Sequence, residues 1–249
     1  MARYTIFIDS GVTPLVNISN NRKNTKTALI IGASGLVGEQ LLLLLLASQH
    51  YSRVIAIVRQ PLALEHNKLE QFTINFKNLD EQLNTHFAIA NETNSEQLKV
   101  DHIYCTLGTT IKKAGSKEAF YQVDHNYPLT IAEHFHHRGA SLFAIVSAIG
   151  ANKHSAVFYN QVKGKVEANL ADIGYQHLGI FQPSMLVGNR KEFRLGEYLG
   201  TIFMKLFALI IPKKYQVIEA IKVANAMMAF ADKPSKEISI IQSDQMQNH

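Results

Sequence analysis

Three glycines at intervals of three residues, Gly32, Gly35 and Gly38, stand between a short apolar run and a longer one. Residues 28–31 before them predict a buried strand, and the residues after them predict an apolar helix that ends near Ser48. Glycine allows a tight turn and close approach of the backbone to a ligand, and the start of the following helix attracts a pyrophosphate. A glycine trio placed between strand and helix therefore predicts a dinucleotide-binding loop, although such glycines can also serve packing alone.

Strand-like and helix-like segments alternate along the rest of the chain, with short connections. This alternation, with continuous apolar strands, is typical of a parallel sheet covered by helices on both faces. The sequence thus predicts an α/β fold with a doubly wound parallel sheet, the Rossmann fold, in three α/β/α layers. The predicted strands are 28–31, 53–58, 72–76, 101–107, 142–146, 177–181 and 237–241, and the later predicted helices are 79–90, 116–137, 156–172, 197–211 and 217–231.

The length of 249 residues and the hydrophobic fraction of 47% suit one large domain. We expect residues 1–26 to form an N-terminal extension, with residues 4–8 as a candidate edge strand. We expect residues 27–249 to form one NAD(P)-binding domain, in which residues 184–236 shape the substrate side. The net charge of +5 is spread over scattered lysines and arginines. It favours an anionic cofactor or simple solubility over a nucleic-acid partner, which needs a continuous basic stripe.

Two apolar runs, 41–46 and 202–211, are much shorter than the roughly 20 residues that span a bilayer. We interpret them as packing segments and expect no stable membrane insertion; the second is compatible with a homodimer face. The lone Cys105 excludes an intrachain disulfide and a cysteine-based zinc site. Residues 1–20 lack a basic start followed by an apolar core, so we expect a cytoplasmic protein.

The second predicted strand ends at Arg59, with no carboxylate beside it. An acidic residue at this point would hold the ribose 2′-hydroxyl of NAD(H), whereas an arginine accommodates the 2′-phosphate of NADP(H). The sequence therefore favours NADP(H) over NAD(H) as the cofactor. The alternative is a solvated arginine at a strand end.

The predicted fifth strand ends at Ser147, and twelve residues later a helix carries Tyr159 and Lys163. These two side chains are one turn apart and share a helix face, where a cationic amine beside a phenol favours the phenolate. The phenol can then give a proton to a carbonyl or take one from an alcohol, and the Ser147 hydroxyl can bind the same oxygen. We predict Ser147, Tyr159 and Lys163 as catalytic residues, against the alternative of an ordinary amphipathic helix.

These motifs together resemble the atypical short-chain dehydrogenases/reductases, in the NAD(P)-binding branch of Tat-interacting oxidoreductase-like proteins. The similarity runs from about residue 27 to residue 231. The stretches that carry it are 31–38, 107–116, 159–164 and 190–197, of which the second and the fourth are the more specific to this branch.

The resemblance implies a role for each matching residue. The glycine loop would cradle the pyrophosphate, and Arg59 at the end of the second strand would bind the 2′-phosphate. Leu107 and Gly108, at the end of the fourth strand, would lie beside the riboses. Lys163 would also hold the nicotinamide ribose. Two positions depart from the family pattern, because Gln182 stands where an arginine is common and Asn75 stands where an aspartate is common. The implied cofactor residues are Gly32, Ser34, Gly35, Leu36, Val37, Gly38, Arg59, Leu107, Gly108, Tyr159, Lys163 and, bordering the nicotinamide, Pro183.

The resulting hypothesis is an NADP(H)-dependent oxidoreductase that acts on a small-molecule carbonyl or alcohol. One alternative is a regulatory or protein-binding module that senses the nicotinamide pool with little turnover. A weaker one is epimerase or dehydratase chemistry on a nucleotide sugar, which usually needs a larger C-terminal domain than the about 65 residues after Pro183. His134, His136 and His137 lack the i, i+4 spacing that suits a metal, so we predict no metal site and a solvated helix end.

Overall fold

The computed structural model describes residues 25–87, 98–187, 212–235 and 238–249. Its main sheet has seven strands, and each neighbouring pair runs parallel. The strands are β1 (Lys26–Ile31), β2 (Tyr51–Val58), β3 (Leu69–Thr73), β4 (His102–Cys105), β5 (Leu142–Val146), β6 (His177–Gln182) and β9 (Ile238–Gln242). Their spatial order is β3-β2-β1-β4-β5-β6-β9.

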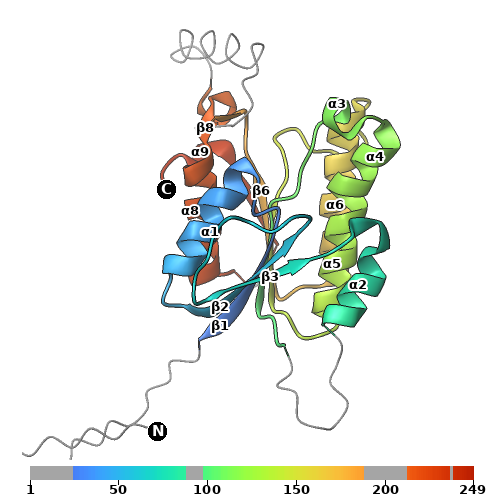
Figure 1. The fold of residues 1–249 in the computed structure, drawn as a ribbon. Helices are drawn as coiled ribbons and strands as arrows, with labels where there is room; N and C mark the ends of the chain where they lie inside the picture. The colour runs from blue at the N-terminus through green and yellow to red at the C-terminus, as the bar shows by residue number, and fades with distance from the viewer. Residues whose placement is uncertain (1–24, 88–97, 188–211, 236–237) are drawn as a thin grey trace, which may run out of the picture.

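Helices cover both faces of this sheet, which confirms the predicted three-layer Rossmann fold (Figure 1). α1 (Leu36–Ala47) and α8 (Ala220–Asp232) lie on one face, and α2 (Leu79–His86), α5 (Tyr127–His136) and α6 (Phe158–Ile173) lie on the other. Successive residues of β1 alternate between the two cores, since Ile30 packs on the α1 side and Ile31 on the α5 side. Both are fully buried. Burial on both faces explains why the strands read as continuous apolar runs.

The third strand is three residues earlier than predicted, because β3 ends at Thr73 and the prediction was 72–76. β3 pairs with β2 from Leu69 to Thr73, and Asn75 then leaves the sheet. The Asn75 side chain accepts a hydrogen bond from the Lys77 amide at 3.1 Å and caps a short 3-10 helix, η1 (Phe76–Asn78). This local bond competes with strand pairing, which an alternation of apolar residues cannot reveal.

The predicted helix 116–137 begins as expected at Ser116, whose hydroxyl accepts the Ala119 amide at 3.0 Å. It is not uniform, however: α4 (Lys117–Tyr121) and α5 are joined by a π-helical turn, η2 (Gln122–Asn126). Pro128 explains the turn, because proline has no N–H to bond the carbonyl four residues earlier, at Asp124. The wider turn leaves Asp124 buried.

Several smaller elements complete the fold. A two-stranded parallel sheet of β7 (Leu186–Val187) and β8 (Ile218–Glu219) was not predicted, nor were α3 (Ile111–Ala114), η3 (Lys213–Tyr215) and α9 (Ser243–Met246). The predicted strand 4–8, the end of the predicted helix 79–90 and the predicted helix 197–211 lie outside the described residues. Among the helices that the structure describes, none has the length and apolar character needed to cross a membrane.

Candidate dinucleotide-binding active site

The order of the strands reverses direction between β1 and β4: β2 and β3 follow on one side of β1, and β4, β5 and β6 follow on the other. Ligands of open α/β sheets bind at such a switch point, beyond the carboxyl ends of the strands. A cleft of about 480 Å³ opens here. Among its lining residues are nine that the sequence predicted: Ser34, Gly35, Leu36, Val37, Leu107, Gly108, Ser147, Tyr159 and Lys163.

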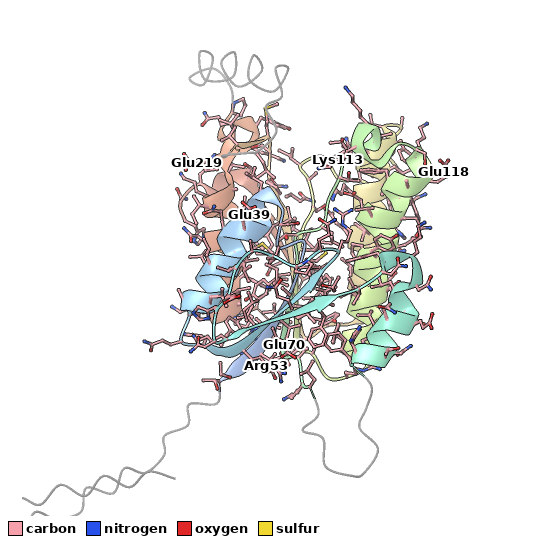
Figure 2. The ribbon with its side chains drawn as sticks, in the orientation of Figure 1. Glu39, Arg53, Glu70, Lys113, Glu118 and Glu219 are labelled. Carbon is pink, nitrogen blue, oxygen red and sulfur yellow. The ribbon has the colours of Figure 1, made fainter. Side chains whose placement is uncertain are left out.

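Two other lining residues mark the sides of this cleft. Glu39 projects from α1 and Lys113 from α3, at the upper end of the sheet in Figure 2. Arg53 and Glu70 pair across β2 and β3 at the opposite end, with 2.8 Å from Arg53 Nε to Glu70 Oε2. The candidate site thus occupies the end of the sheet where the loops after β1 and β4 meet.

The glycine loop owes its compactness to Gly32 and Gly38. Gly32 has φ +87°, and a Cβ there would lie 2.7 Å from the carbonyl carbon of Thr106, at the end of β4. A Cβ on Gly38 would lie 2.0 Å from the Gly32 carbonyl oxygen. These two glycines therefore serve close packing of the loop and do not line the cleft.

The start of α1 fits the pyrophosphate that the loop predicts. Gly35 is the N-cap residue, and as a glycine it offers no side chain to cap the first amides of the helix. Leu36 and Val37 from this first turn line the cleft. Amides that the cap residue leaves available and the positive end of a 12-residue helix dipole form a suitable anion site.

Besides Gly32 and Gly38, two more predicted cofactor residues lie outside the cleft lining. Arg59 directly follows β2 and is exposed. Pro183 is buried, and its carbonyl accepts the Ile149 amide at 3.0 Å. Leu186 from β7 lines the cleft instead, a residue that the sequence argument missed because β7 is only two residues long.

Lys163 is paired with a carboxylate on the floor of the cleft. Its Nζ lies 2.7 Å from Asp124 Oδ1, and the two side chains are only 5% and 0% exposed. The other Asp124 oxygen accepts the Thr109 amide at 2.9 Å. Burial alone would lower the pKa of Lys163, but the charge of Asp124, with help from Tyr159, outweighs it and raises the pKa above its ordinary value. The amine is therefore held in its charged form.

Ser147 is bonded to a second carboxylate that the sequence argument missed. Its hydroxyl donates to Glu167 Oε1 in a short contact, and the Gln182 amide donates to both Glu167 oxygens at 3.0 Å. Burial raises the pKa of Glu167, and the bonds from Ser147 and Gln182 and the charge of Lys163 only partly offset this effect. Gln182, noted as a departure from the family pattern, thus has a partner inside the site.

Tyr159 completes the predicted trio from the helix turn before Lys163. Its ring packs 5.5 Å from the ring of Phe120, and the residue lines the cleft. Tyr159, Lys163 and Glu167 are spaced i, i+4 and i+8 on α6, so a search along one helix face would have found Glu167. Asp124 had no such signal, because the π-turn that places it is not visible in the residue pattern.

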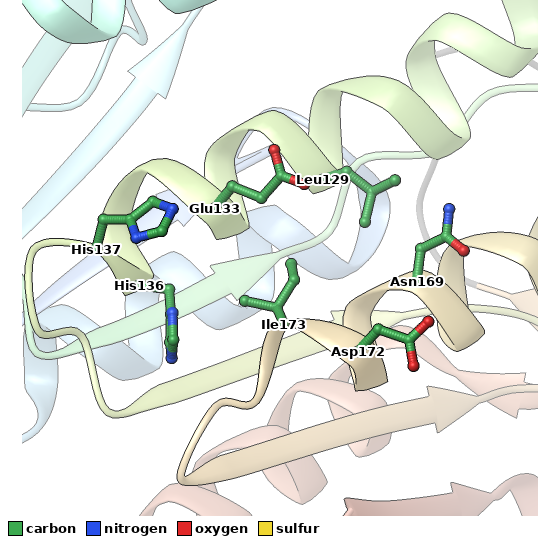
Figure 3. A pocket seen from close by; sticks show the side chains of 7 residues that line it. All are labelled: Leu129, Glu133, His136, His137, Asn169, Asp172 and Ile173. Atoms are coloured by element: carbon green, nitrogen blue, oxygen red, sulfur yellow. The ribbon is translucent and has the colours of Figure 1, made fainter.

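A second hollow of about 490 Å³ lies between α5 and α6, away from the predicted site residues (Figure 3). Glu133 and His136 from α5 line it, as do His137 just after that helix and Asp172 from α6. Within the described part of the chain, no group of three or more such side chains is placed to hold a metal ion. The prediction of a solvated histidine cluster is wrong for His134, which is 6% exposed and packs against the rings of Phe87 and Phe135.

Comparison of the sequence with known proteins assigns the chain to a family. Residues 28–159 match the model of the NAD dependent epimerase/dehydratase family. The chain is similar to Protein HTATIP2 of Rattus norvegicus, with 36% identity over 73% of this chain and 72% of that protein. It is also similar to a fungal protein named "Protein FMP52, mitochondrial" from Candida glabrata, with 30% identity over 73% of this chain and 72% of that protein.

Solved structures share the fold at low identity. A short-chain dehydrogenase from Leptospira borgpetersenii with bound NAD+ has a TM-score of 0.63 and 13% identity, covering 89% of this chain and 93% of that one. A short-chain dehydrogenase from Burkholderia cenocepacia in complex with NADP has a TM-score of 0.60 and 15% identity, covering 90% of each. At this identity the likeness concerns the fold alone. The family match, the relatives and the common fold together show that the chain belongs to the NAD dependent epimerase/dehydratase family, of short-chain dehydrogenase/reductase type, whose cofactor is a nicotinamide dinucleotide.

Proposed function

We propose that the protein is an NADP(H)-dependent oxidoreductase that interconverts a small-molecule carbonyl and alcohol. One observation carries the proposal: a single cleft brings the pyrophosphate loop together with Ser147, Tyr159 and Lys163. The loop residues come from the start of α1 and the three side chains come from β5 and α6, so they are far apart in the sequence. Their meeting at the switch point of the sheet is what dinucleotide-dependent catalysis on this fold requires.

Each side chain has a distinct part in the proposed reaction. A bound nicotinamide dinucleotide supplies the hydride donor or acceptor. Tyr159 gives the proton to the reduced oxygen or removes it from the alcohol. Lys163, held charged by Asp124, stabilises negative charge on the Tyr159 oxygen and contributes to holding the nicotinamide ribose. Ser147 positions the reacting oxygen beside Tyr159.

The choice of NADP(H) rests on the end of β2. Arg59 is exposed directly beyond the strand, where a 2′-phosphate would lie if the adenosine follows the usual path across β1 and β2. No carboxylate stands beside Arg59 in the sequence to bind a 2′-hydroxyl instead. A guanidinium also suits phosphate better than a lysine does, because its donors form a planar fork.

A dinucleotide-sensing module with little turnover is the second candidate. The observation in its favour is that the Lys163 amine and the Ser147 hydroxyl are both bonded to carboxylates, Asp124 and Glu167. In such a module the bound dinucleotide would change the surface to which a partner protein binds.

The cytoplasmic location also remains our proposal, and imaging of tagged protein in cells would distinguish it from a mitochondrial location. A homodimer through residues 202–211 concerns a segment outside the described residues.

Turnover tests the first candidate directly. We expect the purified protein to oxidise NADPH in the presence of at least one member of a panel of aldehydes, ketones and quinones. Tyr159→Phe should lower this rate by about 100-fold or more, the usual contribution of general acid catalysis. Tyr127→Phe is the matched control, because that ring packs against Phe76 outside the cleft. NADPH binding without turnover in the wild type, for all substrates, would favour the sensing module.

A further inference from the structure

Glu167 lies on α6 next to the candidate catalytic serine, and its neighbours come from two strand ends and from its own helix. Ser147 reaches it from the end of β5, Gln182 from the end of β6, and Lys163 lies one turn earlier on α6 itself. Ser147 and Gln182 are both buried. Glu167 itself is half-buried, and two of its three neighbours, Ser147 and Lys163, line the cleft.

The bond between Ser147 and Glu167 restricts what the serine can do for a substrate. While Glu167 is a carboxylate, it can only accept, so the Ser147 proton points at Glu167 and the serine presents lone pairs to the cleft. In that state Ser147 can accept a bond from an alcohol but cannot donate one to a carbonyl. Once Glu167 is protonated it can donate to Ser147 Oγ, which frees the Ser147 proton for a carbonyl oxygen.

We propose that Glu167 is a positioning residue that sets the hydrogen-bond polarity of Ser147, so that its protonated form supports carbonyl reduction and its ionised form supports alcohol oxidation. The inference rests on the proposed function of this site. The proposed switch forms no covalent bond to substrate. One proton moves between Glu167 and solvent, and the Ser147 O–H rotates in response. The Gln182 amide holds the carboxyl in place in both states, because it donates to either oxygen.

The surroundings of Glu167 favour its protonated form more than water does, because they raise the pKa of the carboxyl above its ordinary value. Burial raises its pKa, whereas Ser147, Gln182 and Lys163 lower it in part. Lys163 acts on Glu167 weakly for a neighbour one turn away, since its own charge is paired with Asp124 at 2.7 Å. The hydrogen bonds from Ser147 and Gln182 therefore contribute more to lowering the pKa of Glu167, and the bond from Ser147 can be removed by one substitution.

The titration of Glu167 in the unliganded protein tests the coupling without any substrate. In protein labelled with ¹³C at the glutamate side-chain carboxyl, Glu167→Gln identifies the Glu167 resonance by its loss. Ser147→Ala should move the Glu167 titration midpoint to higher pH, because the ionised form loses a donor. Asp172→Asn, at an exposed position of the same helix away from Ser147, should leave the midpoint in place. An unchanged midpoint in Ser147→Ala would overturn the proposal.

A second arm uses turnover, in case the wild type reduces a member of the carbonyl panel. Glu167→Gln cannot ionise, so its rate of carbonyl reduction should lose the pH dependence that Glu167 confers and keep the dependence set by the other groups. An identical pH profile in Glu167→Gln and wild type would also overturn the proposal. If Glu167→Gln does not fold, Glu167→Asp retains the carboxyl but draws it back from Ser147, and should lose the Ser147-dependent shift. Failure of all turnover would reject the proposed function, while the carboxyl titration would still decide this inference.

Discussion

The Lys163 amine and the Asp124 carboxylate lie 2.7 Å apart at the bottom of the cleft, almost completely out of water. They come from α6 and from the π-turn between α4 and α5, so the pair joins two helices across the floor of the site. A buried pair of this kind contributes little net stability, because desolvation costs about as much as attraction returns. It does fix the position and the charge of Lys163, which the proposed chemistry needs.

Removing one member of this pair should cost far more than removing both. Asp124→Asn leaves the Lys163 charge buried and unpaired, so we expect the free energy of unfolding to fall by roughly 3 kcal/mol. Asp124→Leu combined with Lys163→Met should recover much of that loss, because no buried charge remains. Urea unfolding of the three proteins measures the difference. Equal midpoints for wild type and Asp124→Asn would show that the pair is solvated.

The glycine loop predicts a contrast between two alanine substitutions. In Gly38→Ala the new methyl would meet the Gly32 carbonyl oxygen at 2.0 Å, so α1 must move away from β1. We expect a loss of about 2 kcal/mol or more in stability and severely weakened dinucleotide binding. Gly108→Ala is the matched control for folding, because its nearest neighbour, Asp124 Oδ1, would be 3.7 Å away. Thermal melting of both variants checks the contrast, and similar losses in the two would contradict this account of the loop.

Stability should depend on pH through a buried histidine far from the site. His102 bonds Tyr51 and Lys26 through its two ring nitrogens, and burial lowers its pKa to about 4. In the unfolded chain its pKa is about 6.5, so the unfolded state gains a proton first as the pH falls. The contribution of His102 to the free energy of unfolding is therefore fully present above pH of about 6.5. It declines by roughly 3 kcal/mol as the pH falls towards about 4.

His134, whose pKa burial also lowers to about 4, should add to this decline. Urea unfolding between these pH values measures the slope. Substitution of His102 by Gln should flatten the curve, whereas substitution of the exposed His137 by Gln should not. A curve that stays level down to pH of about 4 would contradict the buried, neutral state of both rings.

The cofactor preference depends on one exposed side chain. Arg59→Ala should weaken NADPH binding by roughly tenfold or more and leave NADH binding almost unchanged, because only NADPH carries the 2′-phosphate. Arg53→Ala removes the same charge from the other end of β2 and is the control. Equal effects of both variants on NADPH would indicate a general electrostatic attraction rather than a contact with Arg59.

Sequence reasoning was most successful where periodicity or a turn residue decides the structure. The strand 142–146 was predicted with its observed bounds, and the glycine loop was predicted between the first strand and the first helix, where the structure has it. It failed at β3, where the Asn75 side chain ends the strand early, and in the helix after Ser116, where Pro128 induces the π-turn. Each departure arises from one residue that changes the regular backbone bonds: the Asn75 side chain accepts a backbone amide, and Pro128 lacks an N–H to donate.

The residues of the candidate site also divide into those that the sequence predicted and those that it did not. Tyr159 and Lys163 were predicted from one turn of a helix, and Ser147 from a strand end, because those relations are local. Asp124 was missed because its role depends on packing between elements that are distant in the sequence. Glu167 was also missed, although its place two turns after Tyr159 on the same helix face was a local signal. The variants described above test whether the predicted residues act as proposed.

Binding of the dinucleotide to the wild-type protein is the most direct test of the account. We would titrate the purified protein with NADPH and with NADH and follow nicotinamide fluorescence at a stated ionic strength. The account predicts saturable binding of one molecule per chain, tighter for NADPH than for NADH, and abolished in Gly38→Ala. Binding of neither dinucleotide by folded wild-type protein would contradict the proposed function and would mean that the cleft serves some other ligand.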